Sequence, residues 1–271
     1  MATELKTAPA VPARSDGLET VMKILVIDIG GTNVKLLASG QDNPRKFPSG
    51  PELTPGQMVA GVLEATRDWK YDTVAIGYPG PILCGQPMAE PANLGSGWVG
   101  FDFEAAFQLP VKIINDAAMQ ALGSYQAGKM LFVGLGTGFG AAVVKDGTVE
   151  ALELGRFHYK KGTLEQYVGA RGLKRLGRKK WRRHVAEALH RLIEALKPDD
   201  LVIGGGNVKK LNTLPLGARA GDKGNAFAGG FCLWEGNANR KGTVATTQPA
   251  DPANVGGRAR RAHVTPPRLI G

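Results

Sequence analysis

Short apolar runs bounded by glycine, proline or polar residues recur along the chain and alternate with longer amphipathic stretches. Short runs of β-branched and aliphatic residues are typical of buried strands, whereas apolar residues spaced three and four apart indicate helices. We expect strands over residues 23–28, 33–38, 73–76, 111–114, 131–135, 141–145 and 201–203. We expect helices over residues 55–70, 116–127, 181–196 and 224–236, and a loop over 150–168. This alternation favours an α/β protein.

Two of the expected helices carry start signals. Thr54 and Gln57 have the spacing of a capping box, and Pro55 between them suits the first helical position. Asp116 is expected to be the N-cap of the second helix, which should stop at Gly128. Both signals place a helix directly after a polar turn.

Two strand pairs are each joined by a turn of glycine and threonine. The first turn follows Asp28 and contains Gly30, Gly31 and Thr32, with Lys35 just beyond it. The second has the sequence Gly136-Thr-Gly-Phe-Gly140. Because glycine has no side chain, backbone N–H groups at such turns can approach an oxyanion closely, and a carboxylate can hold Mg²⁺ through water. Each turn alone is also compatible with an ordinary hairpin; together they indicate an internal repeat that clamps phosphates.

Composition narrows the class of protein. The chain has 271 residues, of which 43% are hydrophobic and 21% charged, as in globular proteins. It has no apolar run long enough to span a bilayer, residues 1–20 lack the apolar core of a secretory signal, and there are only two cysteines. These features favour a cytoplasmic protein with no membrane partner.

The net charge of +10 is concentrated in two segments. Residues 169–191 hold nine lysines and arginines with Glu187 as the only acid, and residues 237–271 are also basic. A polyanionic partner, either nucleic acid or inorganic polyphosphate, is one interpretation; a solvated helix face is the other. We expect residues 1–20 to be a disordered leader and residues 237–271 a disordered basic tail.

Four segments in order resemble the sugar kinases of the ROK family. They are Asp28-Ile-Gly-Gly-Thr-Asn-Val-Lys35, Asn115-Asp116, Gly136-Thr-Gly-Phe-Gly140 and Gly204-Gly-Gly-Asn207. The resemblance covers about residues 23–236. It implies the two-lobed actin-like ATPase fold (ribonuclease H-like, as in hexokinase), with an N-terminal lobe over 21–115 and a C-terminal lobe over 116–236. The segments Lys179-Lys180-Trp181 and Pro198-Asp199-Asp200-Leu-Val-Ile-Gly-Gly-Gly206 are similar to the polyphosphate glucokinase branch of the family.

The resemblance also implies a role for each matching residue. By resemblance, the first phosphate loop comprises Asp28, Gly30, Gly31, Thr32 and Lys35, and Asp28 holds Mg²⁺ through water. The second phosphate loop comprises Gly136, Thr137 and Gly138. The loop on the nucleoside side comprises Gly204, Gly205 and Gly206. Sugar hydroxyls are expected to be bound by Gly80, Asn93, Asn115, Asp116, Glu153 and Glu165.

The chemistry of phosphoryl transfer independently requires one carboxylate. A sugar hydroxyl is a weak nucleophile, so a base must accept its proton as it attacks phosphorus, and Asp116 is the candidate. The sequence departs from the family after Gly155, where Arg156 replaces the usual histidine. His158 is interpreted as an ordinary loop residue, and the alternative is that it takes the place of that histidine. The zinc-binding cysteines of many ROK proteins are lacking, so no zinc is expected.

We therefore expect a glucokinase that uses ATP, polyphosphate or both as donor with Mg²⁺, and the resemblance implies a homodimer. The alternatives are a kinase for mannose or an N-acetylated sugar, and a ROK-like sugar sensor without catalysis. Nucleic-acid binding is disfavoured because no aromatic residues are interleaved with the basic ones beyond Trp181, which is assigned to the helix core.

Overall fold

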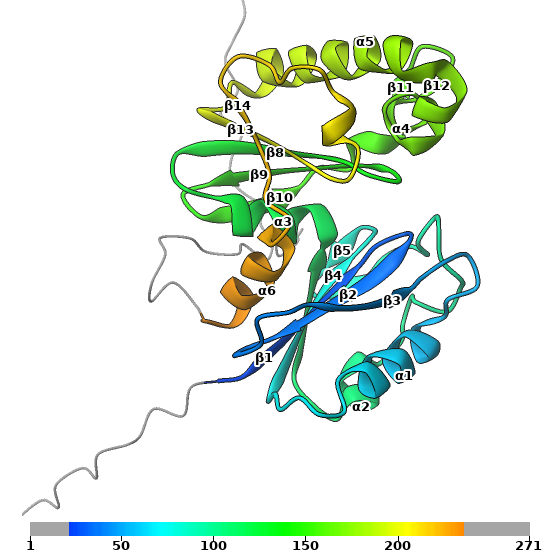
Figure 1. Ribbon diagram of the computed structural model, residues 1–271, viewed down its shortest axis with the longest axis vertical. Coiled ribbons are helices and arrows are strands. Elements are labelled where there is room, and N and C mark those ends of the chain that lie inside the picture. The colour runs from blue at the N-terminus through cyan, green and yellow to red at the C-terminus, as the bar shows by residue number, and fades with distance from the viewer. Residues whose placement is uncertain (1–21, 236–271) are drawn as a thin grey trace, which may run out of the picture.

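The computed structural model describes residues 22–235, and the predicted leader and the predicted tail lie outside these residues. Two five-stranded sheets lie one above the other (Figure 1). The first contains β1 (Ile24–Ile29), β2 (Asn33–Ala38), β3 (Arg45–Pro48), β4 (Thr73–Tyr78) and β7 (Val111–Asn115). The second contains β8 (Lys129–Leu135), β9 (Phe139–Lys145), β10 (Thr148–Ala151), β13 (Asp200–Gly204) and β14 (Ala218–Ala220).

The helices fill the connections between these strands. They are α1 (Pro55–Ala65), α2 (Phe103–Phe107), α3 (Asp116–Ser124), α4 (Leu164–Val168), α5 (Ala170–Leu196) and α6 (Asn225–Glu235). Short elements complete the described chain: β5 (Ile82–Leu83), β6 (Gln86–Pro87), β11 (His158–Tyr159), β12 (Gly162–Thr163) and the 3₁₀ turns η1 (Leu154–Arg156) and η2 (Val208–Lys210). Within residues 22–235, no helix combines the length and apolar character that a bilayer crossing requires.

The two sheets have the same topology, which confirms the predicted internal repeat. Their strand orders are β3-β2-β1-β4-β7 and β10-β9-β8-β13-β14. In each sheet the first three strands along the chain form an antiparallel meander, and the next strand pairs in parallel with the first strand of that meander. Each glycine turn therefore joins the first two strands of its own sheet, so the turns occupy equivalent positions.

The capping box at the start of α1 is confirmed, but two predicted helix ends were wrong. Gln57 N–H donates to Thr54 Oγ1 over 3.4 Å and the Gln57 side chain accepts from Thr54 N–H over 3.0 Å. This helix ends at Ala65 instead of residue 70. The helix expected to run to Ala127 ends at Ser124.

The N-cap of α3 is Asn115 and not Asp116, which corrects the prediction. Asn115 Oδ1 accepts from the backbone N–H groups of Ala117 at 2.9 Å and Ala118 at 3.1 Å. An amide on the last residue of β7 reaches two free N–H groups of the first turn, so Asp116 becomes the first residue of the helix.

Segment 150–168 is not a continuous loop, and the basic stretch before Trp181 is helical. The first contains the end of β10, η1, the β11–β12 hairpin and α4. The second is the start of α5, which bends at Gly177, where φ is 72°. Trp181 is fully buried against the second sheet and its Nε1–H donates to Val168 O over 2.7 Å, so its interpretation as a core residue is confirmed.

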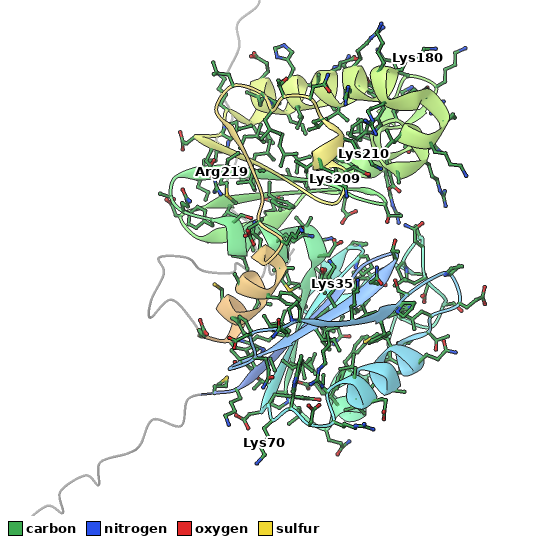
Figure 2. The ribbon with its side chains drawn as sticks, viewed as in Figure 1. Lys35, Lys70, Lys180, Lys209, Lys210 and Arg219 are labelled. Atoms are coloured by element: carbon green, nitrogen blue, oxygen red, sulfur yellow. The ribbon has the colours of Figure 1, made fainter. Side chains whose placement is uncertain are left out.

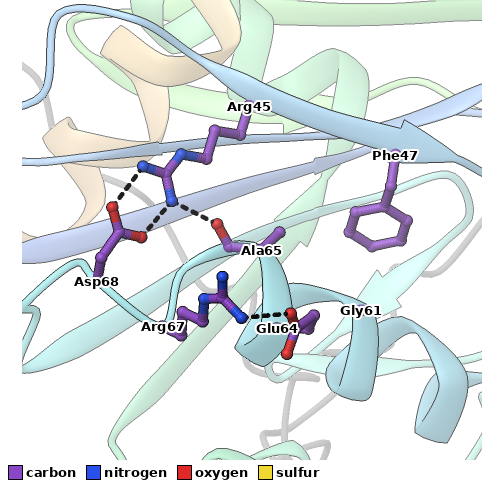
Figure 3. Close-up of a pocket in the computed structure, with 7 residues that line it drawn as sticks. All are labelled: Arg45, Phe47, Gly61, Glu64, Ala65, Arg67 and Asp68. Carbon is purple, nitrogen blue, oxygen red and sulfur yellow. Dashed lines mark hydrogen bonds and ion pairs between the residues drawn. The ribbon is translucent and has the colours of Figure 1, made fainter.

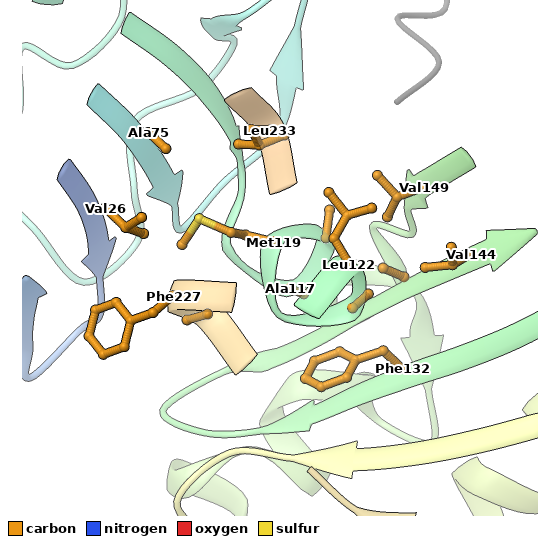
Figure 4. Packing of buried hydrophobic residues seen from close by; sticks show 14 of the residues in the cluster. Val26, Ala75, Ala117, Met119, Leu122, Phe132, Val144, Val149, Phe227 and Leu233 are labelled. Carbon is orange, nitrogen blue, oxygen red and sulfur yellow. The ribbon is translucent and has the colours of Figure 1, made fainter. Parts of the chain in front are cut away.

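Helices α3 and α6 lie between the sheets and connect them. Figure 4 shows Met119 and Leu122 of α3 among residues of both sheets, with Val26 and Phe132 on opposite sides and Phe227 of α6 beside them. Lys112 Nζ donates to Leu233 O over 2.7 Å, so α6 returns the chain to the first sheet. The division into lobes at residues 115 and 116 stays a prediction; α3 begins at that point.

The helices α3 and α6 cross at two glycines. A Cβ atom on Gly123 would lie 1.9 Å from Asn225 O, and one on Gly229 would lie 1.8 Å from Met119 O. No side chain fits at either position, because the backbones themselves are in contact. The close packing of α3 against α6 therefore requires glycine at both positions.

We expect Gly229→Ala to lower the free energy of unfolding by about 1–3 kcal/mol, because the added methyl forces the crossing helices apart. Urea denaturation followed by circular dichroism measures this change. The matched control is Gly56→Ala in α1, where nothing lies within 4 Å of the added Cβ. The control is expected to gain up to about 1 kcal/mol from helix propensity. Equal stability of the Gly229→Ala protein and the native one would contradict the role assigned to this crossing.

Candidate active site

The first glycine turn joins β1 to β2 and carries an ion pair at its base. Asp28 lies directly across the hairpin from Lys35, and Lys35 Nζ donates to Asp28 Oδ2 over 2.7 Å. Asp28 is only 5% exposed, whereas Lys35 is exposed. The turn is closed by Gly30 N–H, which donates to Asn33 O over 3.0 Å. A buried carboxylate paired with an exposed ammonium group therefore lies next to the turn.

The second glycine turn joins β8 to β9 and is held from outside by two hydrogen bonds. Gly136 O accepts from Asn207 Nδ2–H over 2.8 Å, and Thr137 O accepts from Ala170 N–H over 3.0 Å. Both bonds are accepted by carbonyl groups of the turn, so they do not occupy its N–H groups.

The two turns approach each other closely. A Cβ atom built on Gly31 would lie 3.4 Å from Thr137 Oγ1, so the tip of the first turn is in near contact with the second. Equivalent turns of the two sheets therefore face each other across the interface between the sheets, as the internal repeat predicts.

A cleft of about 700 Å³ opens beside the facing turns. Nearly all the predicted site residues line it: Asp28, Gly30, Gly31, Thr32, Lys35, Gly80, Asn93, Asn115, Asp116, Gly136, Thr137, Gly138, Glu153, Glu165, Gly205 and Gly206. Gly204 does not; it ends β13, buried where a Cβ atom would lie 2.7 Å from the ring of Phe132. Residues distant in sequence are thus gathered in one cleft, and their individual roles stay predictions.

Asp116 lies where the cleft meets the N-terminus of α3. Its Oδ1 accepts from Ala117 N–H over 2.8 Å. Burial raises the pKa of the Asp116 carboxyl to about 7, with further increases from the negative charges of Asp28 and Glu153, against the lowering effect of the Ala117 hydrogen bond. A carboxyl group that titrates near neutral pH in a cleft is suited to accept and release protons.

A second carboxyl group, that of Glu165 in α4, lies beside the second glycine turn. A Cβ atom on Gly138 would lie 3.3 Å from Glu165 Oε1, and one on Gly155 would lie 3.3 Å from Glu165 Oε2. Burial raises the pKa of Glu165, while the positive charges of Arg171 and Arg156 lower it. This end of the cleft is therefore rich in carboxylates, with Arg156 as a nearby cation.

The predicted sugar-binding residues Asn115 and Gly80 are already hydrogen-bonded to each other. Asn115 Nδ2–H donates to Gly80 O over 3.1 Å, while Asn115 Oδ1 caps α3. One N–H of the Asn115 amide is left for a ligand. Asn93 lies beside the first glycine turn, because a Cβ atom built on Gly31 would be 3.4 Å from the Cβ of Asn93.

None of the lysines and arginines of residues 169–191 lines the cleft. Ala170 is the only residue of 169–191 in the lining, and Figure 2 shows Lys180 on the outer side of α5. His158, two residues after Arg156, is exposed on β11 and is likewise absent from the lining. The cations that do line the cleft are Lys35, Arg156, Lys209 and Lys210. Lys209 and Lys210 were not predicted as site residues. Their only signal in the sequence is their position shortly after the glycines of residues 204–206.

A second pocket, of about 670 Å³, lies between β3 and α1 (Figure 3). Its charged groups are paired with one another: Arg45 Nη2–H donates to Asp68 Oδ2 over 2.7 Å, and Arg67 pairs with Glu64 at 3.1 Å. It contains none of the predicted site residues, and its ion pairs account for its polar groups.

The cleft suits Mg²⁺ bound in part by a substrate. Within residues 22–235, no three His, Cys, Asp or Glu side chains are placed to hold a metal ion together. Mg²⁺ is commonly held by one or two carboxylates, water and substrate phosphates, and Asp28 beside the N–H groups of a glycine turn fits that mode.

Comparison with known proteins identifies the fold. Residues 24–154 match the model of the ROK family. The structure is similar to an inorganic polyphosphate/ATP-glucomannokinase from Arthrobacter sp. strain KM, with a TM-score of 0.69 and 21% identity over 77% of this chain and 96% of that one. It is also similar to a ROK family glucokinase from Streptomyces griseus, solved with glucose and AMPPNP, with a TM-score of 0.65 and 16% identity over 78% and 98% of the chains.

A third similar structure is a ROK family transcriptional regulator, a homologue of the E. coli MLC protein. The TM-score is 0.60 with 16% identity over 79% of this chain and 78% of the regulator. No curated protein sequence matches the chain significantly. The predicted two-lobed actin-like ATPase fold is confirmed by these similarities.

We expect the side-chain carboxyl of Asp116 to titrate near pH 7 in carbon-13 NMR spectra of the labelled protein. Glu153→Gln is expected to lower this pKa, because it removes one of the negative charges that oppose ionisation. The matched control is Glu150→Gln, which removes an exposed carboxylate on β10 outside the cleft lining and is expected to leave the titration unchanged. Titration of Asp116 near pH 4 in the native protein would contradict the electrostatics described for the cleft.

Proposed function

We propose that this chain, which carries a ROK family domain over residues 24–154, is a sugar kinase. The proposed reaction transfers a phosphoryl group from ATP or inorganic polyphosphate to the 6-hydroxyl of a hexose, with glucose as the first candidate. The observation that carries the proposal is the position of Asp116 at the start of α3, in one cleft with two facing glycine turns.

The glycine turns are proposed to bind the donor phosphates. Gly31 and Thr32 of the first turn, and Gly138 of the second, donate no N–H hydrogen bond to another described residue. Free N–H groups at a turn without side chains form an anion-binding concavity, and they stabilise charge that develops on a moving phosphoryl group. Mg²⁺, held by Asp28 through water, would neutralise charge on the donor phosphates.

Asp116 is proposed to be the general base. The attacking hydroxyl loses its proton as the oxygen bonds to phosphorus, and a carboxylate with a pKa of about 7 is a competent acceptor near neutral pH. The carboxylate form is required, so activity should fall as the pH decreases through the pKa of Asp116. The capping bonds of Asn115 fix the start of the helix and thereby the position of this carboxylate.

The hexose is proposed to occupy the acidic end of the cleft, near Glu153 and Glu165. Carboxylates are strong acceptors for sugar hydroxyls, and both residues line the cleft together with Asn93. Arg156 lies at the same end and faces the charge of Glu165. Many ROK kinases have histidine at this position. The Arg156 guanidinium would therefore change the preference among glucose, mannose and N-acetylated sugars relative to those kinases.

A second candidate function is sugar sensing without catalysis, which the similarity to a transcriptional regulator supports. Such a protein would bind a hexose at the same end of the cleft but transfer no phosphoryl group. The candidates are separated by turnover, since both predict sugar binding. The carboxyl of Asp116, with its raised pKa, favours the kinase.

We expect Asp116→Asn to reduce kcat by about 10²–10⁴-fold, because the amide cannot accept the proton of the hydroxyl. The dissociation constant for the hexose should change little, because the amide is of the same size and still makes hydrogen bonds. A coupled assay for hexose 6-phosphate measures the first quantity and calorimetric titration the second.

The matched control is Asp42→Asn, which makes the same chemical change at an exposed position outside the cleft lining. The control should keep the native kcat. If the Asp116→Asn protein turned over at the native rate, the assignment of the base would be wrong.

A further inference from the structure

Two lysines of the cleft have no role in the proposed reaction so far, and both belong to the segment after β13. Lys209 and Lys210 belong to η2 and line the cleft beside Gly205, Gly206 and Asn207. Figure 2 shows both lysines with the second sheet and Lys35 with the first. They add two cations to the part of the cleft lining that comes from the side of the second sheet.

This segment is fixed to the second glycine turn. Asn207 is 8% exposed; its N–H donates to Leu135 O over 2.9 Å and its Nδ2–H to Gly136 O over 2.8 Å. From the other side, Arg182 Nε–H donates to Lys210 O over 2.7 Å. The backbone that carries the two lysines is thus held next to the turn proposed to bind the donor.

The two ammonium groups are not neutralised by the protein. Within residues 22–235, neither forms an ion pair with an acidic side chain, whereas Lys35 in the same cleft is paired with Asp28. Lys209 is exposed and Lys210 is half-buried. Positive charge without a partner in a cleft attracts an anionic ligand.

The cleft also offers little aromatic surface on which a nucleotide base could stack. Among residues 22–235, Phe139 is the one aromatic residue that lines it. Its ring is 7% exposed and belongs to the core cluster of the second sheet. The lining residues that precede the two lysines along the chain are Gly205, Gly206 and Asn207, whereas base-binding pockets are predominantly apolar and aromatic.

We propose that Lys209 and Lys210 bind the phosphates of the donor that lie beyond the glycine turns, and that they favour a linear polyphosphate over a nucleotide. This inference rests on the proposed kinase function. In the reaction, the bond between the terminal phosphorus and its bridging oxygen breaks and a bond from that phosphorus to the sugar oxygen forms. The proton of the hydroxyl passes to Asp116, and the polyphosphate leaves one phosphate shorter.

The test compares two double variants that remove the same charge. Lys209→Ala/Lys210→Ala removes the proposed contacts, and Lys179→Ala/Lys180→Ala removes two exposed lysines of α5 outside the cleft lining. Steady-state kinetics are measured for the full chain with glucose, using long-chain polyphosphate and ATP as alternative donors.

We expect the first variant to raise KM for polyphosphate at least about tenfold, the loss expected from charge-assisted contacts. KM for ATP should rise by a smaller factor, because the phosphates of a nucleotide end at the glycine turns. The second variant should keep native values for both donors. Equal changes for the two donors, equal effects of the two variants, or no effect would each overturn the proposal.

Binding measurements separate this proposal from the proposed function. If the native chain phosphorylates no hexose with either donor, the kinase proposal fails, and calorimetric titration with polyphosphate alone still tests the lysines. The native chain and the α5 variant are expected to bind polyphosphate with equal affinity, and the Lys209→Ala/Lys210→Ala variant at least about tenfold more weakly. Equal binding by all three proteins would overturn the assignment of the lysines.

Discussion

The arrangement of the site depends on the start of α3, where Asn115 caps the helix. Its Oδ1 accepts from two backbone N–H groups and its Nδ2–H donates to Gly80 O, so one amide ties β7, α3 and the turn after β4 together. Asp116 follows directly as the first residue of α3, and it lines the cleft. Because α3 also packs between the sheets, the carboxylate is held at the boundary of the two halves of the molecule.

The cleft contains charges of both signs, which would serve different parts of the proposed reaction. Burial and the negative charges of Asp28 and Glu153 raise the pKa of Asp116, which suits this carboxyl to accept a proton near neutral pH. In the proposed kinase, Glu153 and Glu165 would accept hydrogen bonds from sugar hydroxyls. Lys209 and Lys210, which form no ion pair within residues 22–235, would attract the donor phosphates. The glycine turns would place N–H groups next to the transferred phosphorus.

The sequence was sufficient to predict those parts of the fold that depend on local chemistry. The two hairpins with their glycine turns, the capping box at Thr54 and the buried face of α5 around Trp181 all follow from residue types at fixed spacing. The short strands β3 and β14 were not predicted, because their sequences Arg-Lys-Phe-Pro and Ala-Arg-Ala contain no apolar run and pair only at sheet edges.

The candidate site was less predictable where it depends on contacts between distant segments. Either residue type can cap a helix, so the residue types alone do not distinguish Asn115, the observed cap, from Asp116. The segment that carries Lys209 and Lys210 is held beside the cleft by the bond from Asn207 to Gly136, between residues 71 positions apart. The basic segment of α5 has the stronger signal in the sequence, but none of its lysines and arginines lines the cleft.

The central claim is that the facing turns and Asp116 form a phosphoryl-transfer site. The most direct test is phosphorus NMR of the native chain incubated with glucose, Mg²⁺ and either ATP or polyphosphate. The account predicts a hexose 6-phosphate signal that grows as the signal of the terminal donor phosphate declines. Saturable binding of glucose with no phosphorylated sugar from either donor would contradict it.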